Sequence, residues 1–433
     1  MFGSLLTTSD HQQQCKLAKS IFKKALESGA SKMHIRDVSN WQVAEGGKSS
    51  KKATRCDSAV FFDDTRYEEF VYMSPGEFLE TTTARVSADL RKDYVGHCSF
   101  ADMVVPIEAK ARHNHCAFEF DHPSRHVTRE HADGGMVALG QIGQYIGTIF
   151  GRQHRTHVLS VYVYRNKARL VYTDRDACVV STPFAYAQPF GDPQSKALQT
   201  FFWRIAHASR EQLGYDSSVE PATKVEFEAM LAYARSLPRS SYAYTQLCYA
   251  LCINVDAGDS GPDPRRTCTQ WPLQRVTRQD GSHVFIGRPR FASSALFGRC
   301  TRGFVAYDPR EDGALYFMKD LWRVDHPEIE PEHEIYEQLH ANDVTNIPTC
   351  LGGEDVGSDT ARGWQRSRTL DIQVLLGSAG IDKEPQLRAR GHYRIFFKEV
   401  LLPVTDFANF QELVLFLADA LYGGCEPSLR PVF

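Results

Sequence analysis

The segment from Gly298 to Leu339 constrains the fold of this chain more than any other part of the sequence. Residues 304–307 and 315–319 are short apolar runs, and the turn residues Pro309-Arg310-Glu311-Asp312-Gly313 separate them. Aromatic and β-branched residues on both sides of such a turn predict a β-hairpin. Beyond the hairpin, apolar residues recur at helical spacing from Glu332 onward, which predicts a helix.

The ends of these elements carry the residue types of a phosphate-binding site. The run Gly298-Arg299-Cys300-Thr301-Arg302-Gly303-Phe304-Val305 follows the nucleotide-binding pattern G-x-G-x-x-G-x-V. In that pattern the backbone lies against phosphates and the valine, here Val305, covers an adenine. Cys300 departs from the pattern, because its Cβ would crowd the approach that the middle glycine permits. Gly298 and Gly303 keep it.

Lys319 ends the second strand of the hairpin, where an ammonium would neutralise phosphate charge. Such a lysine needs a carboxylate from a helix to hold it, and Glu332 supplies one, with Glu334 as the alternative. Further on, Tyr393-Arg394-Ile395-Phe396-Phe397-Lys398-Glu399-Val400-Leu401 predicts a buried strand that leaves into a connection. In a protein kinase, the backbone at Glu399 and Leu401 of that connection would pair with adenine.

The chain resembles the fungal-type protein kinase family over roughly residues 95–421. The phrases that carry the resemblance are Val105-Pro106-Ile107-Glu108-Ala109-Lys110, Arg152-Gln153-His154-Arg155, Asp174-Arg175 followed by Ser181, Gly214-Tyr215-Asp216, Gly298-Arg299-Cys300-Thr301, Lys319-Asp320-Leu321-Trp322-Arg323, and His392-Tyr393-Arg394 with Lys398-Glu399. The resemblance implies a protein-kinase-like fold, protein phosphorylation as the family activity, and ATP with Mg²⁺ as the cofactor. The family usually has glycine where Cys300 stands.

The second departure from the family concerns the residues that perform phosphoryl transfer. The sequence contains no His-Arg-Asp and no Asp-Phe-Gly motif, and it ends about where the helix before the catalytic loop would continue. Without a base to orient the hydroxyl or an acidic ligand for Mg²⁺, transfer loses its positioning and electrostatic stabilisation. We therefore expect a truncated, inactive kinase or a pseudokinase-like interaction scaffold, with a protein partner over the exposed apolar face.

The expected fold class is α+β, in four segments. Residues 1–57 form an N-terminal helical and flexible segment, and residues 58–240 form a mixed α+β domain of nuclease-like fold. Residues 241–280 form a linker, since 256–264 are rich in Asp, Gly and Pro. Residues 281–433 form a kinase-like N-lobe, with an antiparallel sheet plus one helix, and the start of a truncated helical C-lobe.

The N-terminal domain suggests an alternative function. Glu108-Ala109-Lys110 ends an apolar strand, and Asp102 lies upstream of it. One superfamily of metal-dependent nucleases uses two carboxylates and a lysine in this order. A single extended strand would hold Asp102 and Glu108 about 20 Å apart, so both can bind one metal ion only if the chain turns between them. A domain that does not cleave is the other interpretation.

Composition excludes several classes of protein. The 433 residues are 42% hydrophobic and 24% charged, which is ordinary for a globular protein. The formal net charge of −3 gives no overall attraction to nucleic acid. There is no signal peptide and no apolar run long enough to span a bilayer, and the 11 cysteines are scattered and odd in number. We expect an intracellular protein, cytoplasmic or nuclear, with reduced thiols.

Overall fold

The computed structural model describes most of the chain between residues 32 and 423. The described residues are 32–39, 55–74, 95–120, 133–186, 196–252, 271–310, 314–358, 363–376, 388–401, 407 and 409–423. Among these residues, every helix is too short or too polar to cross a lipid bilayer. Apolar residues at helical spacing predict a helix at residues 14–28, which lie outside the described residues.

The first sheet is mixed, with strands in the order β1-β2-β3-β4-β5-β6 and with β7 also paired to β5. The strands are β1 (Met33–Asp37), β2 (Ser58–Phe62), β3 (Met103–Lys110), β4 (Val158–Tyr164), β5 (Lys167–Thr173), β6 (Cys178–Val180) and β7 (Phe184–Ala185). Neighbouring strands are antiparallel except β3 and β4. These two run parallel because helix α4 (Asp133–Arg152) carries the chain back between them.

Each face of the first sheet buries an apolar layer beneath a helix. On one face, Ile142, Ile146 and Ile149 of α4 pack on alternate residues of the strands. On the other face, Phe202 and Ile205 of α5 (Ala197–His207) do the same. Two short helices also belong to this part of the chain: the π-helix η1 (Tyr67–Val71) and the 3-10 helix η2 (His113–His115). The strands are apolar on both faces because both faces are covered.

The second sheet is antiparallel, in the order β14-β15-β13-β12-β10-β9-β8, and β11 pairs with β12. The strands are β8 (Val219–Pro221), β9 (Gln274–Thr277), β10 (His283–Ile286), β11 (Phe291–Ala292), β12 (Arg302–Asp308), β13 (Ala314–Val324), β14 (Cys350–Asp355) and β15 (Arg390–Phe397). Its helices are α6 (Lys224–Ser236), α7 (Tyr242–Ala250), α9 (Glu332–Ala341), α10 (Thr369–Leu376) and α11 (Phe410–Gly423).

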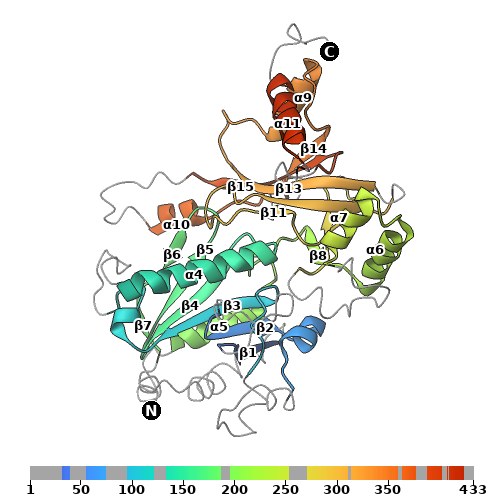
Figure 1. Cartoon of the computed structure of the whole chain (residues 1–433). Coiled ribbons are helices and arrows are strands. Elements are labelled where there is room, and N and C mark those ends of the chain that lie inside the picture. Colours follow the sequence, from blue (N-terminus) through green and yellow to red (C-terminus); the bar gives the residue numbers. More distant parts are fainter. Residues whose placement is uncertain are drawn as a thin grey trace.

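The two sheets are stacked with α4 between them (Figure 1). Leu296, from the loop before β12, packs against the apolar layer beneath α4. The guanidinium of Arg302 donates to the carbonyls of Phe150 and Gln153 at the end of α4, at 3.2 Å each. On the opposite face of the second sheet, Tyr336 of α9 packs on Leu321 and Phe397. The second sheet is therefore covered on both faces, by α4 and by α9.

The elements with strong periodicity form as predicted. The hairpin of β12 and β13 and helix α9 both match the sequence analysis. The run Thr223-Lys224-Val225-Glu226 has the pattern of a capping box, and α6 begins with one: Thr223 Oγ1 accepts a hydrogen bond from the Glu226 amide, and the Glu226 carboxylate accepts one from the Thr223 amide at 2.7 Å. The buried strand predicted from Tyr393 is β15, which ends at Phe397 and leads into the connection with Glu399 and Leu401. The mixed α and β content confirms an α+β protein.

The boundaries between the segments stay predictions, but two placements bear on them. β8 comes from the stretch assigned to the N-terminal domain, yet it pairs with β9 in the second sheet. The stretch assigned to the linker contains α7 and β9, and its residues 253–270 lie outside the described residues. Residues Met230 and Ala234 of α6 pack with Leu247 of α7 against this edge of the second sheet.

Candidate functional site

Lys319 and Glu332 meet on the face of the second sheet that α9 covers. Lys319 lies near the middle of β13, opposite Gly303 of β12 and Ile395 of β15. Its Nζ donates to both carboxylate oxygens of Glu332, at 2.6 and 2.9 Å. Glu332 is the first residue of α9, so the start of this helix carries the carboxylate to the strand. Glu334, the alternative partner, makes no hydrogen bond or ion pair with Lys319.

The glycine-containing loop joins β11 to β12. Ser293 donates its amide to Thr301 across the base of the loop, and Phe291 pairs with Gly303. Gly298 has a φ of 99°, a conformation that a side chain would strain. The predicted strand–turn–strand form is present.

Cys300 occupies the loop in a left-handed conformation, with a φ of 45°. Its side chain is buried, and its Sγ lies 3.4 Å from the carbonyl oxygens of Ala295 and Leu296. The thiol is thus turned inward, onto the loop's own backbone. The loop is also attached to the first layer, because the amide of Gly298 donates to the carbonyl of Arg175 at 2.8 Å.

The charge around Lys319 suits an anion. Arg299 of the loop also contacts Glu332, at 3.2 Å, and its side chain is 60% exposed. Two cations therefore share one carboxylate, which leaves one positive charge beneath the loop. Glu399 and Leu401 follow β15 as predicted, but the carboxylate of Glu399 is bound to Thr349, accepting from its amide and its hydroxyl at 2.8 Å each. Leu401 is exposed.

A buried ion network lies on the other face of β12, β13 and β15. Asp320 contacts both Arg302, at 2.5 Å, and His392. Asp216, from the loop after α5, contacts Arg394, which also donates to Ser218 at 2.8 Å. Gln365 donates to Asp216 at 2.7 Å and lies 2.9 Å from His392 Nδ1. The network ties the loop before β8 to three strands of the second sheet.

The two carboxylates of the network stay ionised because of their partners. Burial alone would raise the pKa of Asp320, but His392 and Arg302 outweigh it and hold that pKa well below its usual range. Arg394 and His392 do the same for the pKa of Asp216. His154 is the opposite case: burial, and then the charge of Arg302, lower its pKa. A neutral His154 can accept the hydrogen bond that Arg302 donates to its Nδ1 at 3.0 Å.

A second group of contacts joins the layers at residues 174–176. Asp174 accepts the amides of Arg368 and Thr369, at 2.7 and 2.8 Å, and so caps the first turn of α10. Asp176 pairs with Arg390 at 3.1 Å. Arg175 lies over the ring of Phe150 at 3.7 Å. The run Asp174-Arg175-Asp176 therefore makes contacts between the two layers.

The comparison with known families agrees with this arrangement. The family model described as fungal protein kinase matches residues 108–424, well over half of the chain. The chain belongs to the fungal protein kinase family. No curated protein and no solved structure matches it. Several phrases that carried the resemblance therefore have a physical role here, because Gln153, His154, Arg175, Asp216 and Arg394 all lie where the two layers of this family member meet.

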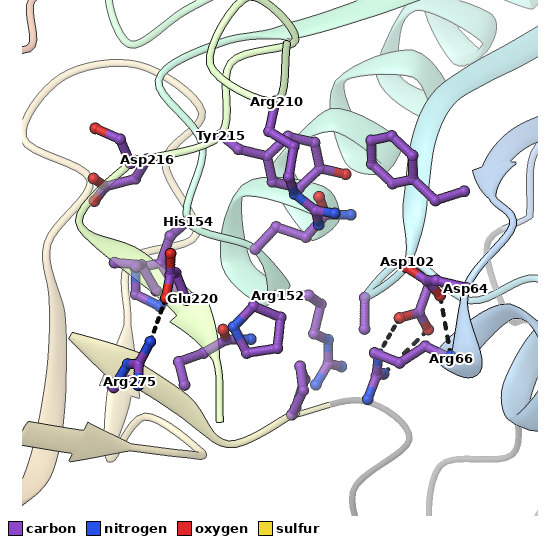
Figure 2. Close-up of a pocket in the computed structure, with 18 of the residues that line it drawn as sticks. Asp64, Arg66, Asp102, Arg152, His154, Arg210, Tyr215, Asp216, Glu220 and Arg275 are labelled. Carbon is purple, nitrogen blue, oxygen red and sulfur yellow. Dashed lines mark hydrogen bonds and ion pairs between the residues drawn. The ribbon is translucent and has the colours of Figure 1, made fainter. Parts of the chain in front are cut away.

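A cavity of about 750 Å³ lies between the first sheet and strands β8 and β9 (Figure 2). Two of its arginines are paired with carboxylates: Arg66 contacts Asp102, and Arg275 contacts Glu220 at 2.5 Å. Lys319 and Glu332 do not line it, so the cavity is separate from the site around Lys319.

Asp102 and Glu108, the two metal candidates, do not come together. Asp102 is bound at the cavity, by Arg66 and by the hydroxyl of Ser99. Glu108 lies six residues along β3, which is continuous from Met103 to Lys110, so no turn brings the two carboxylates together. The carboxylate whose charge acts on Glu108 is that of Asp57, whose Oδ2 accepts a hydrogen bond from the amide of Ala109 at 2.7 Å. The sequence analysis missed Asp57, although it stands directly before the apolar run of β2.

Glu108 is the most perturbed carboxylate of the first sheet. It is 5% exposed, and burial, followed by the charge of Asp57, raises its pKa to about 7. Lys110 contacts Glu108 and also donates to Gln141 Oε1 of α4 at 3.1 Å. Among the described residues, no group of three or more His, Cys, Asp or Glu side chains is arranged to hold a metal ion.

Acid should destabilise the protein partly through His157, which stacks on Tyr172 and contacts the carbonyl of Gln212. Burial, and then the charge of Arg155, lower the pKa of His157 to about 4. Below pH ~6.5 the unfolded chain takes up a proton that the folded chain refuses until about pH 4. We expect this histidine to cost up to about 1.4 kcal/mol of unfolding free energy per pH unit in that window.

The measurement is urea unfolding of the wild type and of His157→Gln at pH 7, 6 and 5. The stability of the variant should fall less with acid than that of the wild type, so the difference between them changes with pH in favour of the variant. Parallel pH profiles would show that His157 is not the group that titrates.

Proposed function

We propose that the second sheet of this kinase-family protein binds Mg·ATP beneath the loop of residues 293–301. The observation that carries the proposal is the ion pair of Lys319 with Glu332. In protein kinases, a lysine on a strand contacts the α- and β-phosphates while a helix glutamate holds it, and both must be in place for nucleotide binding to be productive. Here Lys319 Nζ is already within hydrogen-bond distance of both carboxylate oxygens of Glu332.

Further features support the same ligand. The helix that carries Glu332 follows the lysine strand, and the strand β15 that leads to Glu399 and Leu401 lies beside β13. Gly303 has no room for a side chain, because a Cβ there would lie 2.3 Å from the ring of Phe291. Val305 lies two residues after Gly303 on β12, as in the nucleotide-binding pattern. Cys300 remains the departure from the nucleotide-binding pattern. Its thiol is turned inward, onto the carbonyls of Ala295 and Leu296, so the Cβ alone would crowd a bound phosphate.

Binding is proposed without phosphoryl transfer. The 433 residues contain no His-Arg-Asp and no Asp-Phe-Gly motif, so they supply neither the base nor the acidic metal ligand that transfer needs. We expect these residues alone to give no radiolabelled product from ATP. Transfer that disappears in Lys319→Ala would overturn this expectation.

A scaffold role is the second candidate, and helix α11 favours it. Its side chains Phe410, Val414 and Leu417 are 78%, 63% and 51% exposed. An apolar face of this kind on a helix is a site where another protein surface packs.

The test is a titration with Mg·ATP, followed by the melting temperature and by calorimetry. We expect the wild type to be stabilised, and Lys319→Met to bind at least about tenfold more weakly, because a charge-assisted contact to phosphate is worth about 1.5–3 kcal/mol. Lys224→Met is the matched control, since Lys224 lies on α6 with its side chain 87% exposed. Equal binding by the two variants would refute the role of Lys319, and no response in the wild type would favour the scaffold.

A further inference from the structure

The face of the second sheet that carries Lys319 also carries an exposed aromatic side chain. Phe291 of β11 pairs with Gly303 of β12, and Gly303 pairs with Lys319 of β13. Directly paired residues of antiparallel strands lie side by side on one face of a sheet. Arg302, the neighbour of Gly303, points to the opposite face, where it joins the buried ion network. Phe291 therefore lies on the same face as Lys319, with only Gly303 between them.

A second aromatic ring lies beside Phe291. Phe317 precedes Lys319 by two residues on β13, so the alternation of the strand directs both side chains to the same face. The rings of Phe291 and Phe317 are stacked, with their centroids 6.3 Å apart and their planes inclined by 24°. Both rings approach Gly303 closely, since a Cβ there would meet them at 2.3 and 2.5 Å. Phe291 and Phe317 thus form an aromatic platform next to Lys319.

The valine of the nucleotide-binding pattern is not accessible to a ligand. Val305 is only 1% exposed. Tyr307, which follows it on the same face of β12, packs on helix α7. Phe291, in contrast, is 47% exposed. A ligand bound at Lys319 can therefore contact the aromatic platform, whereas Val305 is covered.

An exposed aromatic ring beside a phosphate-binding ammonium suits a nucleotide, because a base stacks on the ring while the cation contacts the phosphates. Strands β11 and β13 are two strand spacings apart, about 10 Å, which a ribose and its phosphates can span. Resting on the proposal that Mg·ATP binds here, we infer that the nucleotide base stacks on Phe291, with Phe317 supporting its ring. Phe291 takes the place that the sequence analysis gave to Val305. The site then recognises a nucleoside triphosphate by its base as well as by its phosphates.

The test compares Mg·ATP with magnesium tripolyphosphate, which lacks the base and the ribose, by calorimetry on the full chain. Phe291→Ala should weaken Mg·ATP binding about 5- to 150-fold, the range for loss of one base–aromatic stack, and should leave tripolyphosphate binding unchanged. Phe291→Leu keeps an apolar contact at Gly303 but removes the flat ring, so its effect should have the same direction. Phe291→Tyr keeps the ring and should bind both ligands as the wild type does.

Two controls locate the effect. Lys319→Met should weaken the binding of both ligands, because it removes the contact with phosphate. Trp203→Ala should change neither, since it removes a ring of similar exposure, 49%, from helix α5 of the first layer.

Three results for Phe291→Ala would overturn this inference and leave the nucleotide proposal standing. Unchanged Mg·ATP binding would show that the base does not contact the ring. Tighter binding would mean that the ring blocks the site. Equal loss of Mg·ATP and tripolyphosphate would mean that the ring holds the loop and not the base. Absence of Mg·ATP binding in the wild type would instead refute the nucleotide proposal, and this inference with it.

Discussion

Asp320→Ala is expected to lower the free energy of unfolding by about 3–5 kcal/mol, the usual cost of removing one partner from a buried ion pair. Asp320 is 2% exposed and contacts Arg302 and His392 on neighbouring strands. Its removal leaves the guanidinium of Arg302 buried with only carbonyls and His154 as acceptors. An uncompensated charge in that position costs more than the ion pair contributes, so the effect is large whatever the net value of the pair.

Urea unfolding of the wild type and the variant at pH 7 measures this difference. Asp371→Ala is the matched control, because Asp371 is paired with Arg368 at 3.6 Å on the surface, where both side chains are more than half exposed. A surface pair of that kind contributes about 0–1 kcal/mol. A loss below about 1 kcal/mol in Asp320→Ala would mean that water reaches the network and that the two layers are not joined by charge.

The contact of Lys319 with Glu332 could be predicted from sequence because its signals are local. The hairpin of β12 and β13 is encoded by two apolar runs around a turn, and α9 by a helical repeat that begins at Glu332. Lys319 and Glu332 are only 13 residues apart. A strand followed directly by a helix that packs on the same sheet places two such residues close together. Once those elements were assigned, the ion pair followed.

The network between the layers could not be predicted, because its partners are distant in the chain. Asp216 and Arg394 are 178 residues apart, and no periodicity in the sequence relates them. Family resemblance marked both positions without showing that they touch. Composition did not help either, since a formal charge of −3 says nothing about which charges are buried.

The metal candidates show a third kind of limit. Glu108 and Lys110 were found because they are two residues apart on one strand, and alternation puts them on one face. The carboxylate whose charge acts on Glu108 is that of Asp57, which directly precedes β2, 51 residues earlier in the chain, and only the register of β2 against β3 places it there. Asp102 was chosen because it is near in sequence, and a continuous strand then holds it apart from Glu108.

Gly214→Ala is the other substitution with a large expected effect, and it tests how the loop delivers Asp216 to Arg394. Gly214 has a φ of 92°, and a Cβ there would lie 2.2 Å from the carbonyl oxygen of His157, a backbone atom that cannot turn aside. We expect about 1–2 kcal/mol from the backbone conformation and a further 1–3 kcal/mol from overpacking, so a loss of about 2–5 kcal/mol.

Gly281→Ala separates the two contributions. Gly281 has a φ of 77°, and a Cβ there meets no atom within 4 Å, so that substitution should cost only the conformational share. Gly214→Ala must therefore lose clearly more stability than Gly281→Ala in the same urea measurement. Equal losses would show that the backbone at His157 moves to make room for the added Cβ, and that Gly214 is needed for its backbone angle alone. A greater loss would mean that the close approach of Gly214 to His157 fixes the loop, and with it the position of Asp216 against Arg394.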